Sequence, residues 1–115
     1  MGTGLTIGLL HPGQMGSAVG AAVSTGHRVL WISEGRSAAT AARASADGLE
    51  DVVSLARLVE AEVILSVCPP QVAGEVARAV AGIGFDGLYV DANAVSPDAA
   101  RSIGATVEAA GASFV

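Results

Sequence analysis

Apolar residues in this chain fall into short runs that alternate with longer segments of helical spacing. The runs are nearly continuous, which is typical of parallel strands that are covered on both faces. They predict strands at residues 5–10, 28–32, 52–53, 63–67, 88–91 and 112–115. Gly8 is unusual inside such a run and indicates that another group packs closely against the first strand.

Between these runs, apolar residues recur every three or four positions and predict helices. The helices are expected at residues 14–25, 38–46, 55–60 and 71–81, and from residue 97 onward. Ser37, Ser54 and Ser96 stand where an N-cap is needed, and Pro97 suits the first helical position. In the helix at 55–60, we expect Leu55, Leu58 and Val59 to face inward.

Alternating strands and helices with short connections predict a single α/β domain over residues 1–115. We expect a Rossmann-type, doubly wound parallel sheet with right-handed crossovers and strand order 3-2-1-4-5-6. In such sheets, ligands bind at the carboxyl ends of the strands, where the strand order reverses. The candidate site residues are therefore sought just after the predicted strands.

Composition narrows the classes of partner. The net charge of −5 argues against nucleic acid, and no apolar run approaches the roughly 18 residues of a membrane span. A single cysteine, Cys68, excludes an internal disulfide and fits a reducing compartment, so we expect a cytoplasmic protein. No group of His or Cys residues has the spacing of metal ligands, and no metal site is expected.

A glycine-containing turn separates the first strand from the first helix. Such a turn lets a pyrophosphate approach the backbone, and the helix N-terminus offers it free N–H groups. The candidate cofactor-binding residues here are His11, Pro12, Gly13, Gln14, Met15 and Gly16. The alternative is an ordinary strand-to-helix turn, and for His11 a phosphate contact and a simple turn role remain equally open.

The loop after the second strand decides between NAD and NADP. An acidic residue about 20 positions beyond the glycine turn binds the ribose 2′-OH of NAD, whereas an arginine accommodates the 2′-phosphate of NADP. The candidates are Ser33, Glu34, Arg36 and Ser37. Ser33 cannot repel a phosphate, and Arg36 with the two serines can hydrogen-bond one, so we favour NADP over NAD. A solvated pair of Glu34 and Arg36 is the alternative.

The end of the fourth strand is a third candidate segment. Val67, Cys68 and Pro69 are expected to give backbone and packing contacts along the dinucleotide. Nothing in the sequence indicates a base that activates Cys68, and we assign no catalytic residue. Asp91 fits either a hydrogen-bonded acid at a strand end or a cofactor neighbour, and His27 is expected at the surface.

Several of these segments together resemble a known family. They are Gly13-Gln14-Met15-Gly16, Gly26-His27, Pro69-Pro70 and residues 91–97. The chain resembles the amino-terminal, NAD(P)-binding segment of the 6-phosphogluconate dehydrogenase and β-hydroxyacid dehydrogenase superfamily, particularly bacterial phosphogluconate dehydrogenase-like proteins. The resemblance implies hydride transfer between the nicotinamide and a hydroxyacid-like or imine-like substrate. It also implies that Asn93 binds the cofactor, since the corresponding residues of the family approach the nicotinamide.

The sequence departs from the family pattern at important positions. His11 replaces the first glycine of the motif, and Asn93-Ala94 replaces the usual Ser-Thr. Family members continue into a helical domain with a catalytic lysine and the dimer interface, whereas this chain contains no lysine. We therefore expect substrate binding only with such a second domain, and a homodimer remains an expectation. A non-catalytic NAD(P)-sensing domain and an interaction module that binds no nucleotide are the alternatives.

Overall fold

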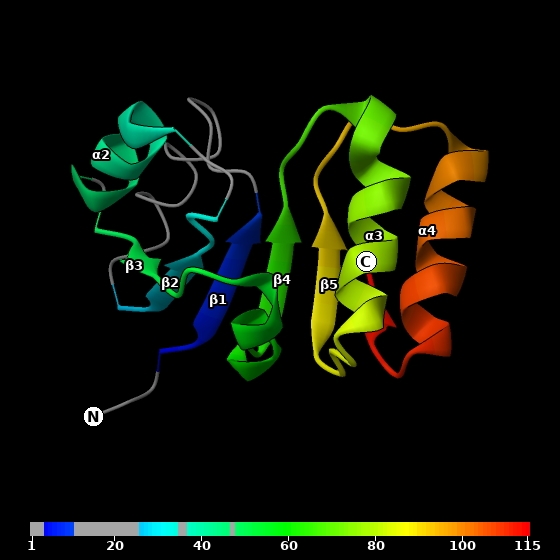
Figure 1. Ribbon diagram of the computed structural model, residues 1–115. Helices are drawn as coiled ribbons and strands as arrows, with labels where there is room; N and C mark the ends of the chain where they lie inside the picture. Colours follow the sequence, from blue (N-terminus) through cyan, green and yellow to red (C-terminus); the bar gives the residue numbers. More distant parts are fainter. Residues whose placement is uncertain (1–3, 11–25, 35–36, 47) are drawn as a thin grey trace.

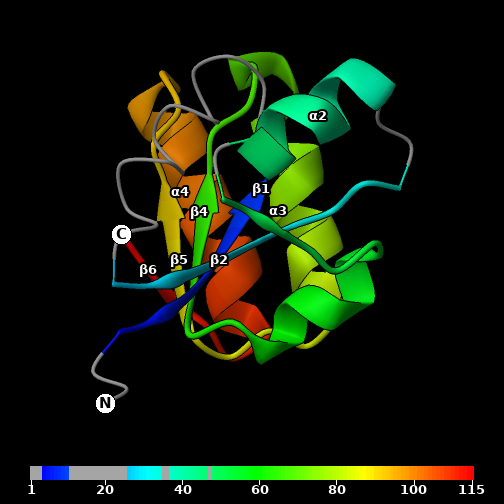
Figure 2. The same cartoon turned by 90° about the vertical axis from the view of Figure 1, so that its left-hand side faces the viewer.

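The six strands form one parallel sheet in the order β3-β2-β1-β4-β5-β6, as the sequence predicts. The computed structural model describes residues 4–10, 26–34, 37–46 and 48–115. The strands are β1 (Thr6–Leu10), β2 (Arg28–Trp31), β3 (Glu50–Asp51), β4 (Val63–Ser66), β5 (Leu88–Asp91) and β6 (Ser113–Phe114). Their carboxyl ends point to the same edge of the sheet (Figure 1). In Figure 2, β2 runs at a steep angle to β4 and β5, as the twist of parallel strands requires.

Three α-helices and two short 3-10 helices connect the described strands. They are α2 (Ala38–Ala46), η1 (Leu55–Glu60), η2 (Pro70–Val72), α3 (Ala73–Gly82) and α4 (Pro97–Ala109). The helix predicted over residues 14–25 lies outside the described residues. Helix α3 begins two residues later than predicted, because Pro69 and Pro70 lead first into the tighter η2 turn.

Two of the three predicted caps are confirmed. The Ser37 hydroxyl accepts the N–H of Thr40 at 3.2 Å, and the Ser96 hydroxyl accepts the N–H of Ala99 at 3.1 Å. The prediction for Ser54 was wrong as far as its side chain is concerned, since it makes no cap hydrogen bond to the described backbone. A 3-10 turn begins there instead of an α-helix.

Two predictions from apolar patterning were wrong. The third strand is Glu50–Asp51 and not residues 52–53, because the chain turns at Val53, which adopts a left-handed φ of 70°. Val59 is 42% exposed, whereas Leu58 is fully buried. A 3-10 helix has three residues per turn, so Leu55 and Leu58 share one face and Val59 is rotated away from it.

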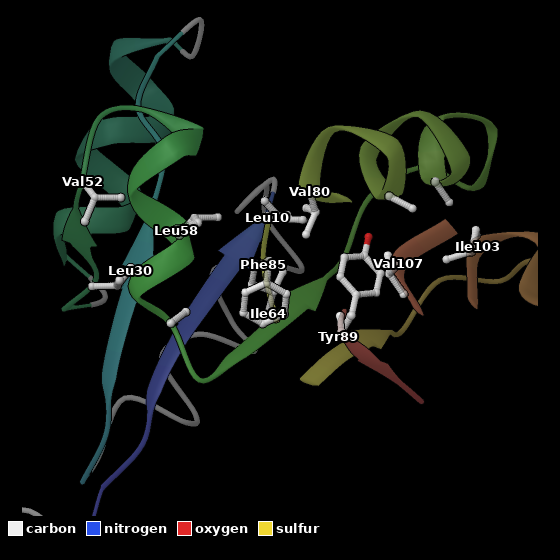
Figure 3. Close-up of a cluster of buried hydrophobic side chains, with 14 residues drawn as sticks. Leu10, Leu30, Val52, Leu58, Ile64, Val80, Phe85, Tyr89, Ile103 and Val107 are labelled. Carbon is white, nitrogen blue, oxygen red and sulfur yellow. The ribbon is translucent and has the colours of Figure 1, made fainter. Parts of the chain in front are cut away.

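Two clusters of buried side chains cover the two faces of the sheet. On one face, Leu10, Leu30, Ile64 and Tyr89 pack beneath η1, α3 and α4. Figure 3 shows this cluster, with Tyr89 between Val80 of α3 and Val107 of α4. On the other face, the second cluster consists of Leu9, Val29, Trp31, Ala44 and Leu49, and it involves α2.

Gly8 has the close neighbour that the sequence indicated. A Cβ atom at Gly8 would lie 2.9 Å from Leu58 Cδ2 and 3.3 Å from Ile64 Cγ1. The absence of a side chain at Gly8 therefore lets η1 pack directly on β1. In the described part of the chain, no helix is both long and apolar enough to cross a membrane.

Candidate functional site

The strand order reverses between β1 and β4, and this is where a doubly wound sheet binds ligands. The two strands end level with each other, since Leu10 of β1 pairs with Ser66 of β4. Beyond Leu10 the chain enters the predicted glycine turn. His11, Pro12, Gly13, Gln14, Met15 and Gly16 all lie outside the described residues, so their assignment stays a prediction.

Three of the four residues predicted to contact the adenosine ribose lie between β2 and α2. Ser33 is half-buried, Glu34 is exposed, and Ser37 precedes the first turn of α2, whereas Arg36 lies outside the described residues. The Glu34 N–H donates to the Val53 carbonyl at 3.0 Å, which ties this loop to the turn after β3. The Ser37 hydroxyl accepts the Thr40 N–H and is 3.1 Å from the Thr40 hydroxyl, so it is ordered at the start of α2.

On the other side of the switch point, hydrogen bonds join the exits of β4 and β5. Asn93 Oδ1 accepts the Cys68 N–H at 2.7 Å, and Asn93 Nδ2 donates to the Ser66 hydroxyl at 3.1 Å. The same Nδ2 lies 3.4 Å from Cys68 Sγ. In the backbone, the Ala92 N–H donates to the Ser66 carbonyl at 3.1 Å. We call Ser66, Cys68 and Asn93 with these bonds the Asn93 network.

Cys68 and Pro69 lie just beyond β4, as the sequence predicted, and Val67, which was predicted as the last residue of the strand, also lies beyond it. Cys68 is half-buried and Pro69 is exposed, while Val67 packs against the second hydrophobic cluster. Contact of these residues and of Asn93 with a cofactor stays a prediction. The structure does bring Asn93 to the β4 exit, although 25 residues separate Asn93 from Cys68.

Asp91 and Tyr89 place two buried polar groups below the Asn93 network. Asp91 Oδ1 accepts the Asn93 N–H at 2.8 Å, which is the hydrogen bond expected of an acid at a strand end. Its Oδ2 and the Tyr89 hydroxyl are buried and have no hydrogen-bond partner among the described residues. Burial raises the pKa of Tyr89 to about 12. The nearby Ser66 hydroxyl offsets part of this rise in the Tyr89 pKa, although the two hydroxyls do not meet the geometry of a hydrogen bond.

Sequence analysis missed the role of Ser66. It is fully buried within an otherwise apolar strand, and its hydroxyl is a hydrogen-bond partner of Asn93. A polar residue inside an apolar run was a usable signal, since buried hydroxyl groups need partners. His27 is exposed as predicted, and its Nδ1 accepts the Leu5 N–H at 2.8 Å.

The described residues hold no group of three or more His, Cys, Asp or Glu side chains that would bind a metal ion. At the exits of β4 and β5, the described hydrogen-bond donors of the Asn93 network are peptide N–H groups and the Asn93 amide. The carboxyl ends of the strands are where sheets of this kind bind organic ligands.

Comparison with known proteins gives matches among solved structures, whereas no protein-family model and no curated protein matches the sequence. One match is a conserved protein of unknown function whose structure is described as similar to 3-hydroxyacid dehydrogenases. It is 28% identical and has a TM-score of 0.83, with 96% of this chain and 42% of that chain covered. Another is 3-hydroxyisobutyrate dehydrogenase from Mycobacterium tuberculosis with L-serine. It is 26% identical, with a TM-score of 0.83 and coverage of 97% of this chain and 39% of that chain.

A third match, an imine reductase from Streptomyces aurantiacus, shares the fold at 18% identity. Its TM-score is 0.77, and the match covers 95% of this chain and 39% of that chain. The chain thus spans about two fifths of the length of these structures. Among the matches are dehydrogenases and reductases, and the resemblance to the amino-terminal domain of the 6-phosphogluconate dehydrogenase-like superfamily is confirmed.

Proposed function

We propose that this chain is the nucleotide-binding domain of an NAD(P)-dependent oxidoreductase. The observation that carries the proposal is the reversal of strand order between β1 and β4, with candidate contacts following β2, β4 and β5 at one edge of the sheet. The similarity to a 3-hydroxyisobutyrate dehydrogenase over nearly the whole chain supports it.

We assign the adenosine half and the nicotinamide half of the ligand to opposite sides of the switch point. The acid or arginine that reads the adenosine ribose follows the second strand of such folds, so the adenosine half lies toward β2. The nicotinamide half then lies across the switch point, toward the exits of β4 and β5. Cys68, Pro69 and Asn93 belong to this second half.

Among the two cofactors, we favour NADP. Ser33 is neutral, and Ser37 orders the N-terminus of α2, whose free N–H groups attract a phosphate. Equilibrium titration of the purified chain with NADPH and NADH tests both cofactor binding itself and the choice of NADP over NAD. No binding of either cofactor at about 1 mM would refute the proposed function, and tighter binding of NADH would refute only the choice of NADP.

Two substitutions sharpen the cofactor test. Arg36→Ala is expected to weaken NADPH binding about tenfold and leave NADH binding nearly unchanged, because only NADPH carries the 2′-phosphate. The matched change in the same loop is Glu34→Gln, which removes the acidic side chain near Arg36 in the sequence. It should strengthen NADPH binding by about twofold, since it removes a negative charge beside that phosphate. A loss of NADH binding by Glu34→Gln instead would identify Glu34 as the ribose ligand of an NAD enzyme.

We infer the reaction from the proposed cofactor, and the dehydrogenases and reductases among the matches support it. A hydride would pass between the nicotinamide and a hydroxyacid-like or imine-like substrate, while this chain binds and orients the cofactor. The chain contains no lysine, and we propose that the acid–base group comes from a separate helical domain. Purified alone, the chain should bind cofactor and oxidise NADPH no faster than buffer does. Rapid turnover by the isolated chain would contradict this division of roles.

A second candidate is a domain that senses NAD(P) without catalysis. Both candidates require cofactor binding, and they differ in what the cofactor does. Restoration of NADPH oxidation by a helical domain supplied separately supports the enzyme, whereas a cofactor-dependent change in partner binding without oxidation supports the sensor.

A further inference from the structure

We propose that Asn93 is a positioning residue for the nicotinamide half of the dinucleotide and acts through Cys68 instead of touching the ligand. The inference rests on the proposed function, since it concerns the same cofactor. It differs from the expectation that the family resemblance gives, in which Asn93 itself approaches the nicotinamide.

The hydrogen bonds of the Asn93 amide point toward the protein. Its Nδ2 donates to Ser66 Oγ at 3.1 Å and lies 3.4 Å from Cys68 Sγ, so both of its hydrogens have acceptors within the network. Its Oδ1 accepts the Cys68 N–H at a short 2.7 Å. One lone pair of Oδ1 remains, and an amide held by these contacts cannot turn its donors toward a ligand without breaking them.

These bonds fix the backbone of Cys68 and Pro69 where the sheet ladder ends. Ser66 pairs with Asp91 as the last residues of β4 and β5, and the chain then leaves the sheet. Past this pair, the Asn93 side chain and the Ala92 N–H join the two exits. Pro69 follows with a fixed φ of −58°, and its carbonyl accepts the Val72 N–H that closes the η2 turn. Holding Cys68 therefore also sets where Pro69 and η2 begin.

Ser66 makes this inference testable. Its side chain is fully buried and cannot reach a bound cofactor, yet its hydroxyl is a partner of the Asn93 amide. If Asn93 acts by holding the β4 exit, then removal of the Ser66 hydroxyl, which binds the Asn93 amide, must weaken cofactor binding. If Asn93 contacts the nicotinamide on its own account, removal of the Ser66 hydroxyl should have little effect on affinity.

The experiment measures dissociation constants of NADPH and of 2′,5′-ADP, which contains only the adenosine half, for four proteins. They are the unmodified chain, Asn93→Leu, Ser66→Ala and the double variant. We expect Asn93→Leu to weaken NADPH binding about tenfold, the scale of one well-made hydrogen bond, with 2′,5′-ADP binding unchanged within about twofold. Ser66→Ala should give a smaller loss of about threefold for NADPH alone. The double variant should be no weaker than Asn93→Leu, because the two residues act as a unit.

Ser96→Ala is the control for stability, because it removes an exposed helix cap on α4 outside the network and should change neither dissociation constant. An equal loss of both ligands in Asn93→Leu would overturn the proposal and leave Asn93 a purely structural residue. A loss in Asn93→Leu with none in Ser66→Ala would overturn it in favour of direct contact. If Asn93→Leu does not fold, the Ser66→Ala comparison alone decides. If the unmodified chain binds neither ligand, the proposed function fails first and this inference fails with it.

Discussion

The buried hydroxyl of Tyr89 predicts how the stability of this protein depends on alkaline pH. The Tyr89 side chain is fully buried between β5 and helices α3 and α4 (Figure 3). Its ring stacks on Phe114 with centroids 6.4 Å apart. Its hydroxyl is buried and has no hydrogen-bond partner among the described residues, and burial disfavours a charged tyrosinate there. Raising the pH from 8 to 12 should therefore destabilise the folded state.

The size of the effect follows from the two pKa values. Burial raises the pKa of Tyr89 to about 12 in the folded protein, whereas an unfolded tyrosine has a pKa of about 10. Below pH 10 Tyr89 is protonated in both the folded and the unfolded state, and its ionisation does not lower the free energy of unfolding. Between pH 10 and pH 12 the unfolded state loses its proton first. The free energy of unfolding should therefore fall by up to about 3 kcal/mol across this range.

The composition of the chain makes the assay specific. Tyr89 is the only tyrosine, there is no lysine, and Trp31 is the only tryptophan. Tyrosinate absorbance therefore reports one residue, and Trp31 fluorescence reports unfolding from within the second hydrophobic cluster. Urea unfolding curves at half-unit pH intervals give the free energy, and the absorbance gives the ionisation.

Two results would refute the reasoning. One is a tyrosinate signal with its midpoint near pH 10 while Trp31 still reports the native state, because this would mean that the hydroxyl is solvated. The other is an unchanged pH dependence in Tyr89→Phe. That variant keeps the ring and its stacking on Phe114 but cannot ionise, and it should be as stable as the unmodified chain at pH 8 or more so.

Two further predictions concern backbone geometry. Gly87→Ala should lower the free energy of unfolding by about 2 kcal/mol, because the new Cβ would overlap the Glu62 carbonyl oxygen and the Phe85 ring. The control is Gly82→Ala, because a Cβ at Gly82 meets open space at the end of α3. This change should raise the free energy of unfolding by about 0.5 kcal/mol. Equal effects of the two changes in urea unfolding would contradict the packing at Gly87. Val53→Asn should also stabilise the chain, by about 1 kcal/mol in the same assay, because Val53 is exposed and its φ of 70° strains a β-branched residue. A loss of stability there would show that the Val53 side chain has a packing role.

The candidate site could be predicted only in part. The sequence located Val67, Cys68 and Pro69 at the end of β4 and Asn93 after β5, because they lie at the ends of apolar runs. It did not indicate that Asn93 binds Cys68 and Ser66 across 25 and 27 residues. Those bonds depend on the register that places Ser66 beside Asp91, and no local pattern encodes this register.

The sequence by itself determined the order of strands and helices, the parallel sheet and the caps at Ser37 and Ser96. Burial on both faces and the needs of a helix end leave marks on neighbouring residues, which a reader of the sequence can recognise. The tertiary structure decided the position of β3, the exposure of Val59 and the Asn93 network. An edge strand such as β3, with exposed Glu50 and Asp51, need not be apolar, and hydrogen bonds between distant side chains form only once the sheet has brought the strand ends together.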